Sequence, residues 1–167
     1  ILTDPRLAEL LADARSIVPV MLEITEHTAI VSYTAVRDAI TTLRELGVTI
    51  AVDDAGSGFS SLRHVLQLQP EVIKIDQTLA AEIAASPARQ ALGRSLIEFG
   101  HEAGARVVIE GIESEHDLDA WRELGAEAVQ GFLTGRPGPL PVAVSCEPIA
   151  ARLLDTTDSQ VSARTPR

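Results

Sequence analysis

Short apolar runs alternate along the chain with longer amphipathic segments. The run at residues 48–52 (VTIAV) is apolar at almost every position, which is typical of a strand buried on both faces in a parallel sheet covered by helices. Five such runs predict strands, at residues 18–24, 48–52, 72–75, 107–109 and 126–129.

The amphipathic segments predict helices. Residues 33–46 place Val36, Ala39, Ile40, Leu43 and Leu46 on one stripe, with charged side chains opposite. Serine caps precede two further helices, which begin after Ser86-Pro87 and after Ser114. Another helix is predicted from Pro5 to about Ala14. The apolar sides expected for the two serine-capped helices are Leu92, Leu96, Phe99 and Ala103, and Leu118, Trp121 and Leu124.

Glycine stands at three junctions between a predicted helix and the next strand, at Gly47, Gly104 and Gly125. A left-handed glycine commonly ends a helix, and regular alternation of helix and strand is typical of βαβ units. A closed eight-stranded barrel needs about 250 residues, whereas this chain has 167. The predicted fold is therefore α/β, an incomplete TIM-like (β/α) barrel with about five of eight parallel strands and flanking helices. The polar stretch from about Ala150 is expected to be disordered.

The amino-acid composition and net charge argue against some classes of function. The chain carries 14 Lys plus Arg and 24 Asp plus Glu, for a net charge of −10, and few aromatic residues. This balance argues against binding to a nucleic acid polymer. The single Cys146 excludes an internal disulfide, and no apolar run is long enough for a membrane span. We therefore expect a cytoplasmic location.

Acidic side chains stand at or near the C-terminal ends of the predicted strands. These ends share one rim in a parallel fold, where such folds build active sites. Carboxylates gathered there would repel one another without a counter-charge, so we expect a divalent cation, Mg²⁺ or Mn²⁺ for all-oxygen ligands. The rim residues are Glu23, Glu26, Asp53, Asp54, Lys74, Asp76, Glu110, Glu113 and Gln130.

Simpler interpretations exist for single residues. One acidic residue after a strand is more often a helix cap or a solvated charge, but capping does not explain Lys74 within an apolar strand. The glycine-rich segment 54–61 fails the dinucleotide fingerprint and suits a mobile loop hinged at Gly56 and Gly58. His64 follows this loop, and a ligand-binding role for it stays open. A nucleophilic role for Cys146 is not expected, and Trp121 is assigned to the core.

Five ordered blocks resemble the EAL-domain cyclic di-GMP phosphodiesterases. They are EITE at 23–26, DDAGSGFSSL at 53–62, KID at 74–76, EGIE at 110–113 and QGF at 130–132. The resemblance runs from about Arg6 to Pro141. It implies a TIM-like barrel that hydrolyses cyclic di-GMP to linear pGpG with two Mg²⁺ or Mn²⁺ ions.

The resemblance also implies roles for single residues. Glu23 matches a ligand of the first metal, Asp53 the bridging ligand and Asp54 a ligand of the second, with Glu110 either a ligand there or the base. Lys74 matches the lysine that holds the attacking water, and Glu113 and Gln130 match positions that complete the site. Glu26 is expected to stabilise the glycine-rich loop with Gly56 and Gly58, and Asp76 is a candidate substrate contact.

The chain departs from the family pattern. The Glu-Ala-Leu segment, a following asparagine ligand and the first three barrel strands are absent, Ala55 replaces an aromatic residue and Ile109 replaces a small one. We therefore expect residues 1–145 to be the C-terminal portion of an EAL domain, from a fragment or a truncated gene, with 146–167 an extension. We expect the isolated chain to be inefficient in catalysis.

Two alternatives to a catalytic fragment stay open: a non-catalytic EAL-like module that binds cyclic di-GMP or a protein partner, and a remnant without a stable fold. The family also implies a homodimer and an upstream sensory or GGDEF-type domain as partners.

Overall fold

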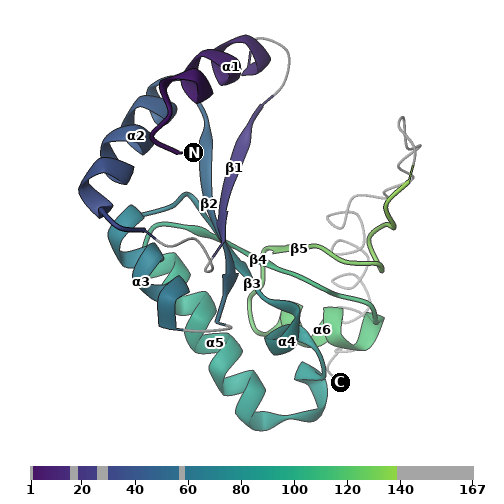
Figure 1. Cartoon of the computed structure of the whole chain (residues 1–167). Helices are drawn as coiled ribbons and strands as arrows, with labels where there is room; N and C mark the ends of the chain where they lie inside the picture. Colours follow the sequence, from purple (N-terminus) through teal and green to yellow (C-terminus); the bar gives the residue numbers. More distant parts are fainter. Residues whose placement is uncertain (1, 16–18, 26–29, 57–58, 139–167) are drawn as a thin grey trace, which may run out of the picture. The chain divides into compact units, whose positions relative to one another are not determined.

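A five-stranded parallel sheet forms the centre of the fold (Figure 1). The computed structural model describes residues 2–15, 19–25, 30–56 and 59–138. The strands are β1 (Met21–Thr25), β2 (Thr49–Ala55), β3 (Val72–Ile75), β4 (Arg106–Ile109) and β5 (Ala128–Val129). Their order in the sheet is their order in the chain, so each connection crosses over to the next parallel strand, as in successive βα units of a barrel. The predicted fold class is confirmed.

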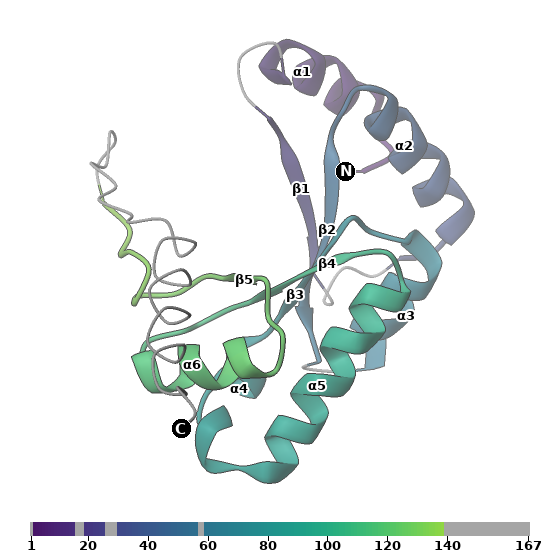
Figure 2. The ribbon, with the colours of Figure 1, turned by 180° about the vertical axis from the view of Figure 1, so that it is seen from behind.

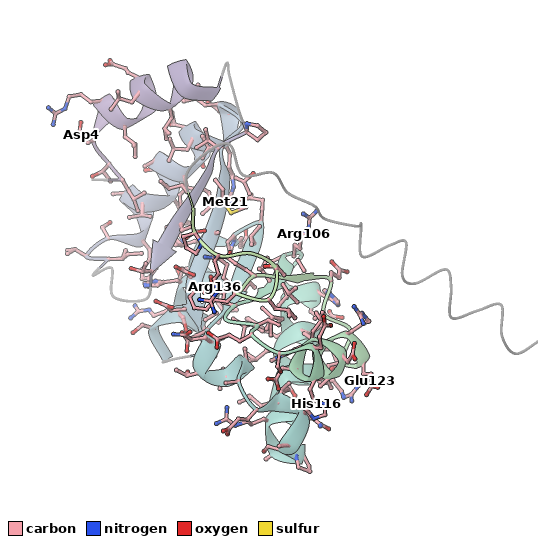
Figure 3. The ribbon with its side chains drawn as sticks, turned by 90° about the vertical axis from the view of Figure 1, so that its right-hand side faces the viewer. Asp4, Met21, Arg106, His116, Glu123 and Arg136 are labelled. Carbon is pink, nitrogen blue, oxygen red and sulfur yellow. The ribbon has the colours of Figure 1, made fainter. Side chains whose placement is uncertain are left out.

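Helices connect the strands. They are α1 (Pro5–Arg15), α2 (Tyr33–Glu45), α3 (Phe59–Leu68), α4 (Gln77–Ala80), the 3₁₀ helix η1 (Ile83–Ala85), α5 (Pro87–Glu102) and α6 (Glu115–Glu123). Helices α2, α3 and α5 follow one side of the sheet in Figure 1, and the view from behind shows the same arrangement (Figure 2). Figure 3 shows Asp4, which precedes α1, toward one end of the described part of the chain. His116 and Glu123 of α6 lie together toward the other end.

The helix boundaries follow local signals in the sequence. Ser86 and Ser114 accept hydrogen bonds from backbone N–H groups in the first turns of α5 and α6, as predicted. Ser32 caps α2 in the same way. The three junction glycines all have positive φ angles, which confirms them as the helix-ending residues.

Apolar side chains between sheet and helices form three core clusters. The first joins Ile24 and Ile50 of the sheet to Ile40 of α2, the second joins Val52 and Ile73 to Val65 of α3, and the third surrounds Trp121. Burial of an isoleucine side chain stabilises the fold by about 1.5–3 kcal/mol. These clusters therefore hold the helices to one face of the sheet.

The predicted inner face of α5 is correct only in part, because Leu96 and Phe99 pack against the core but the other two residues do not. Leu92 and Ala103 are exposed, and the buried positions are Gly93, Ile97 and Gly100. A Cβ at Gly93 would contact the Trp121 ring, so the absence of a side chain admits a close approach of the helix. The pattern of large apolar residues misses this face because two of its three positions carry no side chain.

Three strand boundaries differ from prediction by two residues or more. β2 extends to Ala55 instead of ending at residue 52, so that Asp53 and Asp54 lie inside the strand. β1 begins at Met21, and β5 comprises only Ala128 and Val129. β2 is longer because pairing continues on both sides, with Thr25 of β1 opposite Asp53 and Ile75 of β3 opposite Ala55.

One compact unit comprises residues 1–136. The predicted extension at 146–167 lies outside the described residues, so this boundary stays a prediction. No helix in the described part combines the length and the apolar character needed to cross a lipid bilayer.

Candidate active site

Strand alternation brings four charged side chains to the sheet face opposite the helices. Successive strand residues point to opposite faces, and Ile24, Val52 and Ile73 pack toward the helices. Their neighbours Glu23, Asp53 and Lys74 therefore point away from the helices, and Glu110 does so directly after β4. Three separate strands and the end of a fourth thus supply one cluster, as predicted.

An irregularity in β2 places two consecutive aspartates at this cluster. The β2–β3 register runs from Val52↔Ile73 to Ala55↔Ile75, so β2 has one extra residue between these pairs. Asp54 has a φ of 57° in the left-handed region, which is uncommon for a residue other than glycine. In a regular strand, Asp53 and Asp54 would point to opposite faces. The irregularity instead allows oxygen atoms of both to lie near Glu110.

Lys74 is at the centre of the cluster. Its Nζ lies 2.7 Å from Glu110 Oε1 and 3.1 Å from both Glu23 Oε1 and Asp53 Oδ1, with only 7% of the side chain exposed. Burial lowers the pKa of the ammonium, but its contacts with Glu110, Glu23 and Asp53 outweigh this effect and raise the pKa above its ordinary value. Lys74 is therefore charged at neutral pH.

Glu110 has the opposite balance for a carboxyl group. Burial raises its pKa, the Lys74 ammonium lowers it, and the nearby Asp53 carboxylate raises it again. The net direction is upward. A carboxyl group with a raised pKa is a better proton acceptor than an ordinary glutamate, which suits general base chemistry.

The carboxylates fit a divalent cation. One ligand oxygen from each of Asp53, Asp54 and Glu110 lies within 4.8 Å of the others. Asp53 Oδ1 is buried and receives no hydrogen bond of suitable geometry within the described residues, although the Lys74 ammonium is 3.1 Å away. A buried carboxylate oxygen with a free lone pair, among further hard oxygen donors, matches the ligand preference of Mg²⁺ and Mn²⁺.

A cleft of about 270 Å³ adjoins this cluster. It is lined by Asp54, Asp76, Gln77, Glu110, Gly111, Glu113, Gln130, Gly131 and Phe132. Backbone hydrogen bonds from Gln130 N to Ile109 O (2.8 Å) and from Ile112 N to Gln130 O (3.1 Å) hold the QGF segment against the end of β4. The Phe132 ring is 47% exposed, and the Arg136 guanidinium lies 4.3 Å from its centroid.

The other candidate residues separate into three groups. Glu113 and Gln130 line the cleft, and their roles in the reaction stay predictions. Asp76 also lines it, but its carboxylate caps α4 by accepting a 2.8 Å hydrogen bond from Thr78 N. Glu26 and Gly58 lie outside the described residues. His64 is buried on α3, where Nδ1 is 2.8 Å from the Tyr33 hydroxyl.

Sequence reasoning did not assign Gln77, Gly111 and Phe132 to the site. Gly111 has a φ of 70°, and a Cβ there would collide with Gln77. A glycine between Glu110 and Glu113 was an available signal for such a close approach. Gln77 carried no comparable signal, because its position depends on the turn into α4.

Comparison with known proteins identifies the family. The family model described as EAL domain matches residues 2–137. The chain belongs to the EAL domain family. Cyclic di-GMP phosphodiesterase NbdA of Pseudomonas aeruginosa is 34% identical over 119 residues, 71% of this chain and 15% of that protein. Cyclic di-GMP phosphodiesterase PdeB of Shewanella oneidensis is 34% identical over 134 residues, 80% of this chain and 15% of that protein.

Solved EAL structures share the fold. The EAL domain of Mycobacterium smegmatis DcpA has a TM-score of 0.74 at 30% identity, over 80% of this chain and 62% of that one. Klebsiella pneumoniae BlrP1, in a manganese and cyclic di-GMP complex, has a TM-score of 0.72 at 31% identity, over 80% of this chain and 36% of that one. This EAL chain therefore spans only part of each of these four proteins.

Proposed function

We propose that this chain provides the metal-binding rim and part of the substrate cleft of a cyclic di-GMP phosphodiesterase that yields linear pGpG. The observation that carries the proposal is the convergence of Glu23, Asp53 and Glu110 on the buried Lys74, with Asp54 beside them. The cyclic di-GMP activities named for NbdA and PdeB support the choice of substrate.

Asp53, Asp54 and Glu110 would hold a divalent cation, Mg²⁺ or Mn²⁺, and Glu23 would hold a second one near Asp53. Bound divalent cations supply Lewis acidity and a water of lowered pKa. The net acidity of the chain does not oppose an anionic substrate at such a site, because the cations provide the local positive charge.

The other roles in the reaction are assigned to side chains around the metal-binding rim and the cleft. Lys74 fixes the carboxylates and offsets charge that develops on the phosphate in the transition state. Glu110 has one of two roles: it is a ligand of the cation that Asp53 and Asp54 hold, or it is the base that accepts a proton from the attacking water. Gln130 and Glu113, on the cleft wall, orient the scissile phosphodiester. Asp76 stays a candidate substrate contact through the carboxylate oxygen that does not cap α4.

An inactive binding module would have the same fold, but we would expect some of its acidic ligand positions to carry other residues. The side chains of this chain differ from that expectation. Every acidic ligand position in the described part carries a carboxylate, and Lys74 is in place. A module that only binds a partner has no need for this set of charged groups, so we favour the catalytic assignment.

The test is cyclic di-GMP turnover in the full-length protein that carries this sequence, followed as pGpG by chromatography with Mn²⁺. Asp53→Asn and Lys74→Ala should each lower kcat by at least about 10²-fold with the fold retained. Asp119→Asn is the matched control, because Asp119 is an exposed residue of α6 paired with Arg122. Rates like those of the unmodified protein in both site variants would refute the assignment.

A second measurement addresses the 167-residue chain itself. We expect it to bind Mn²⁺ and to turn over cyclic di-GMP far more slowly than a complete EAL-domain phosphodiesterase, because the family pattern places further metal ligands on a segment that these 167 residues do not contain. Full phosphodiesterase activity of the isolated chain would contradict this expectation.

A further inference from the structure

The backbone leaves β2 through two left-handed residues. Asp54 has a φ of 57° and Gly56 a φ of 100°, directly after the extra residue in the strand. Left-handed geometry costs an L-residue about 1–2 kcal/mol, and aspartate adopts it more readily than most other residues, so contacts with the surrounding structure decide whether Asp54 keeps it. The groups that hold this turn therefore decide whether Asp53 and Asp54 reach the same site.

The peptide unit between Ala55 and Gly56 is hydrogen-bonded at both ends. Its carbonyl oxygen accepts a hydrogen bond from Asp76 N at 3.3 Å, and its N–H donates to Ser61 Oγ at 3.2 Å. A peptide unit is planar, so two such contacts on opposite sides fix its rotation. This rotation sets the ψ of Ala55 and the φ of Gly56, immediately after Asp54.

Ser61 is suited to act as the fixed side of this contact. It is fully buried in the first turn of α3, whereas its neighbour Ser60 is exposed. Val65 and Leu68, further along the same helix, are buried in the core. The serine hydroxyl thus connects a firmly packed helix to the end of β2, across the glycine-rich loop.

We propose that Ser61 is a positioning residue for the Asp53–Asp54 pair. Its hydroxyl holds the Ala55–Gly56 peptide unit, and this unit keeps Asp54 left-handed so that both carboxylates reach the metal-binding rim. The effect that Ser61 should have on metal affinity rests on the proposed function. Its effect on the backbone conformation of Asp54 does not.

The first experiment measures the backbone by NMR on the ¹⁵N,¹³C-labelled 167-residue chain in EDTA. In Ser61→Ala, amide hydrogen exchange at Gly56 should become about tenfold faster relative to the core amide of Ile73, and the Asp54 Cα shift should leave its left-handed range. Ser60→Ala should change neither quantity. Ser61→Thr keeps the hydroxyl and should retain slow exchange at Gly56. Unchanged exchange and Asp54 shift in Ser61→Ala would overturn the proposal.

The second experiment measures Mn²⁺ affinity of the same variants by calorimetry. Ser61→Ala should weaken binding about tenfold, while Ser60→Ala and Ser61→Thr stay within about threefold of the unmodified chain. An altered backbone with unchanged Mn²⁺ affinity would overturn the positioning role. If the unmodified chain binds no Mn²⁺, the metal site of the proposed function fails, and the NMR result still decides whether Ser61 holds Asp54.

Discussion

Replacement of Lys74 by methionine removes a cation that contacts three carboxylates at the rim. Methionine has a similar stem length, so the change mainly removes the ammonium group. In the structure Lys74 Nζ lies within 3.1 Å of Glu23, Asp53 and Glu110, and only Glu23 among these is substantially exposed, at 43%. Asp53 and Glu110, each 17% exposed, would remain close together without a positive partner.

The expected cost follows from these contacts. At an effective dielectric constant near 20, one ion pair at about 3 Å is worth about 5 kcal/mol in Coulomb energy. In the intact protein, the cost of removing the Lys74 ammonium from water offsets much of the Coulomb energy of its ion pairs. Removal of one partner from a buried ion pair costs about 3–5 kcal/mol. Because water screens Glu23, we expect a loss of about 3 kcal/mol in the free energy of unfolding.

Urea unfolding in EDTA at pH 7 measures this loss, with fluorescence of the single, fully buried Trp121 as the signal. Arg122→Met is the matched control, because Arg122 pairs with Asp119 at 2.7 Å where both side chains are more than one-third exposed. Its loss should be about 1 kcal/mol. A loss below about 1 kcal/mol in Lys74→Met, or equal losses in the two variants, would refute the central role of Lys74.

Three further predictions concern pH, metal and packing. Because the pKa of Glu110 is raised in the folded state, the folded protein binds the extra proton, and stability should fall as pH rises from 4.5 through the raised value. Urea unfolding of Glu110→Gln should lack this part of the pH dependence; parallel curves would contradict it. Mn²⁺ at a hundred times the Kd of the unmodified chain should raise its free energy of unfolding by about 2.7 kcal/mol. An equal increase for Asp53→Asn at the same Mn²⁺ concentration would count against the site. Gly131→Ala should lose about 2–3 kcal/mol in thermal unfolding, because its Cβ would collide with the Ile112 backbone. Gly135→Ala, with open space around the Cβ, should change stability by less than about 0.5 kcal/mol.

Local patterns in the sequence were sufficient to predict the order of helices and strands along the chain. Continuous apolar runs such as residues 48–52 indicate strands buried on both sides, and serine caps with junction glycines mark helix ends. These signals depend on interactions within a few residues, so they can be recognised without the fold. The acidic residues near strand ends likewise indicated one rim, because all strands of a parallel sheet run in the same direction.

Contacts between distant segments decided the rest. The inner face of α5 depends on Gly93 and Gly100, whose importance appears only when Trp121 and Val107 pack against them. Two adjacent aspartates share one site because β2 gains a residue against β3 and because Asp54 adopts a left-handed conformation. Alternation alone would separate Asp53 from Asp54. The sequence by itself determined which charged groups end the strands, whereas the irregular pairing of β2 with β3 and the left-handed backbone at Asp54 decided that these groups meet.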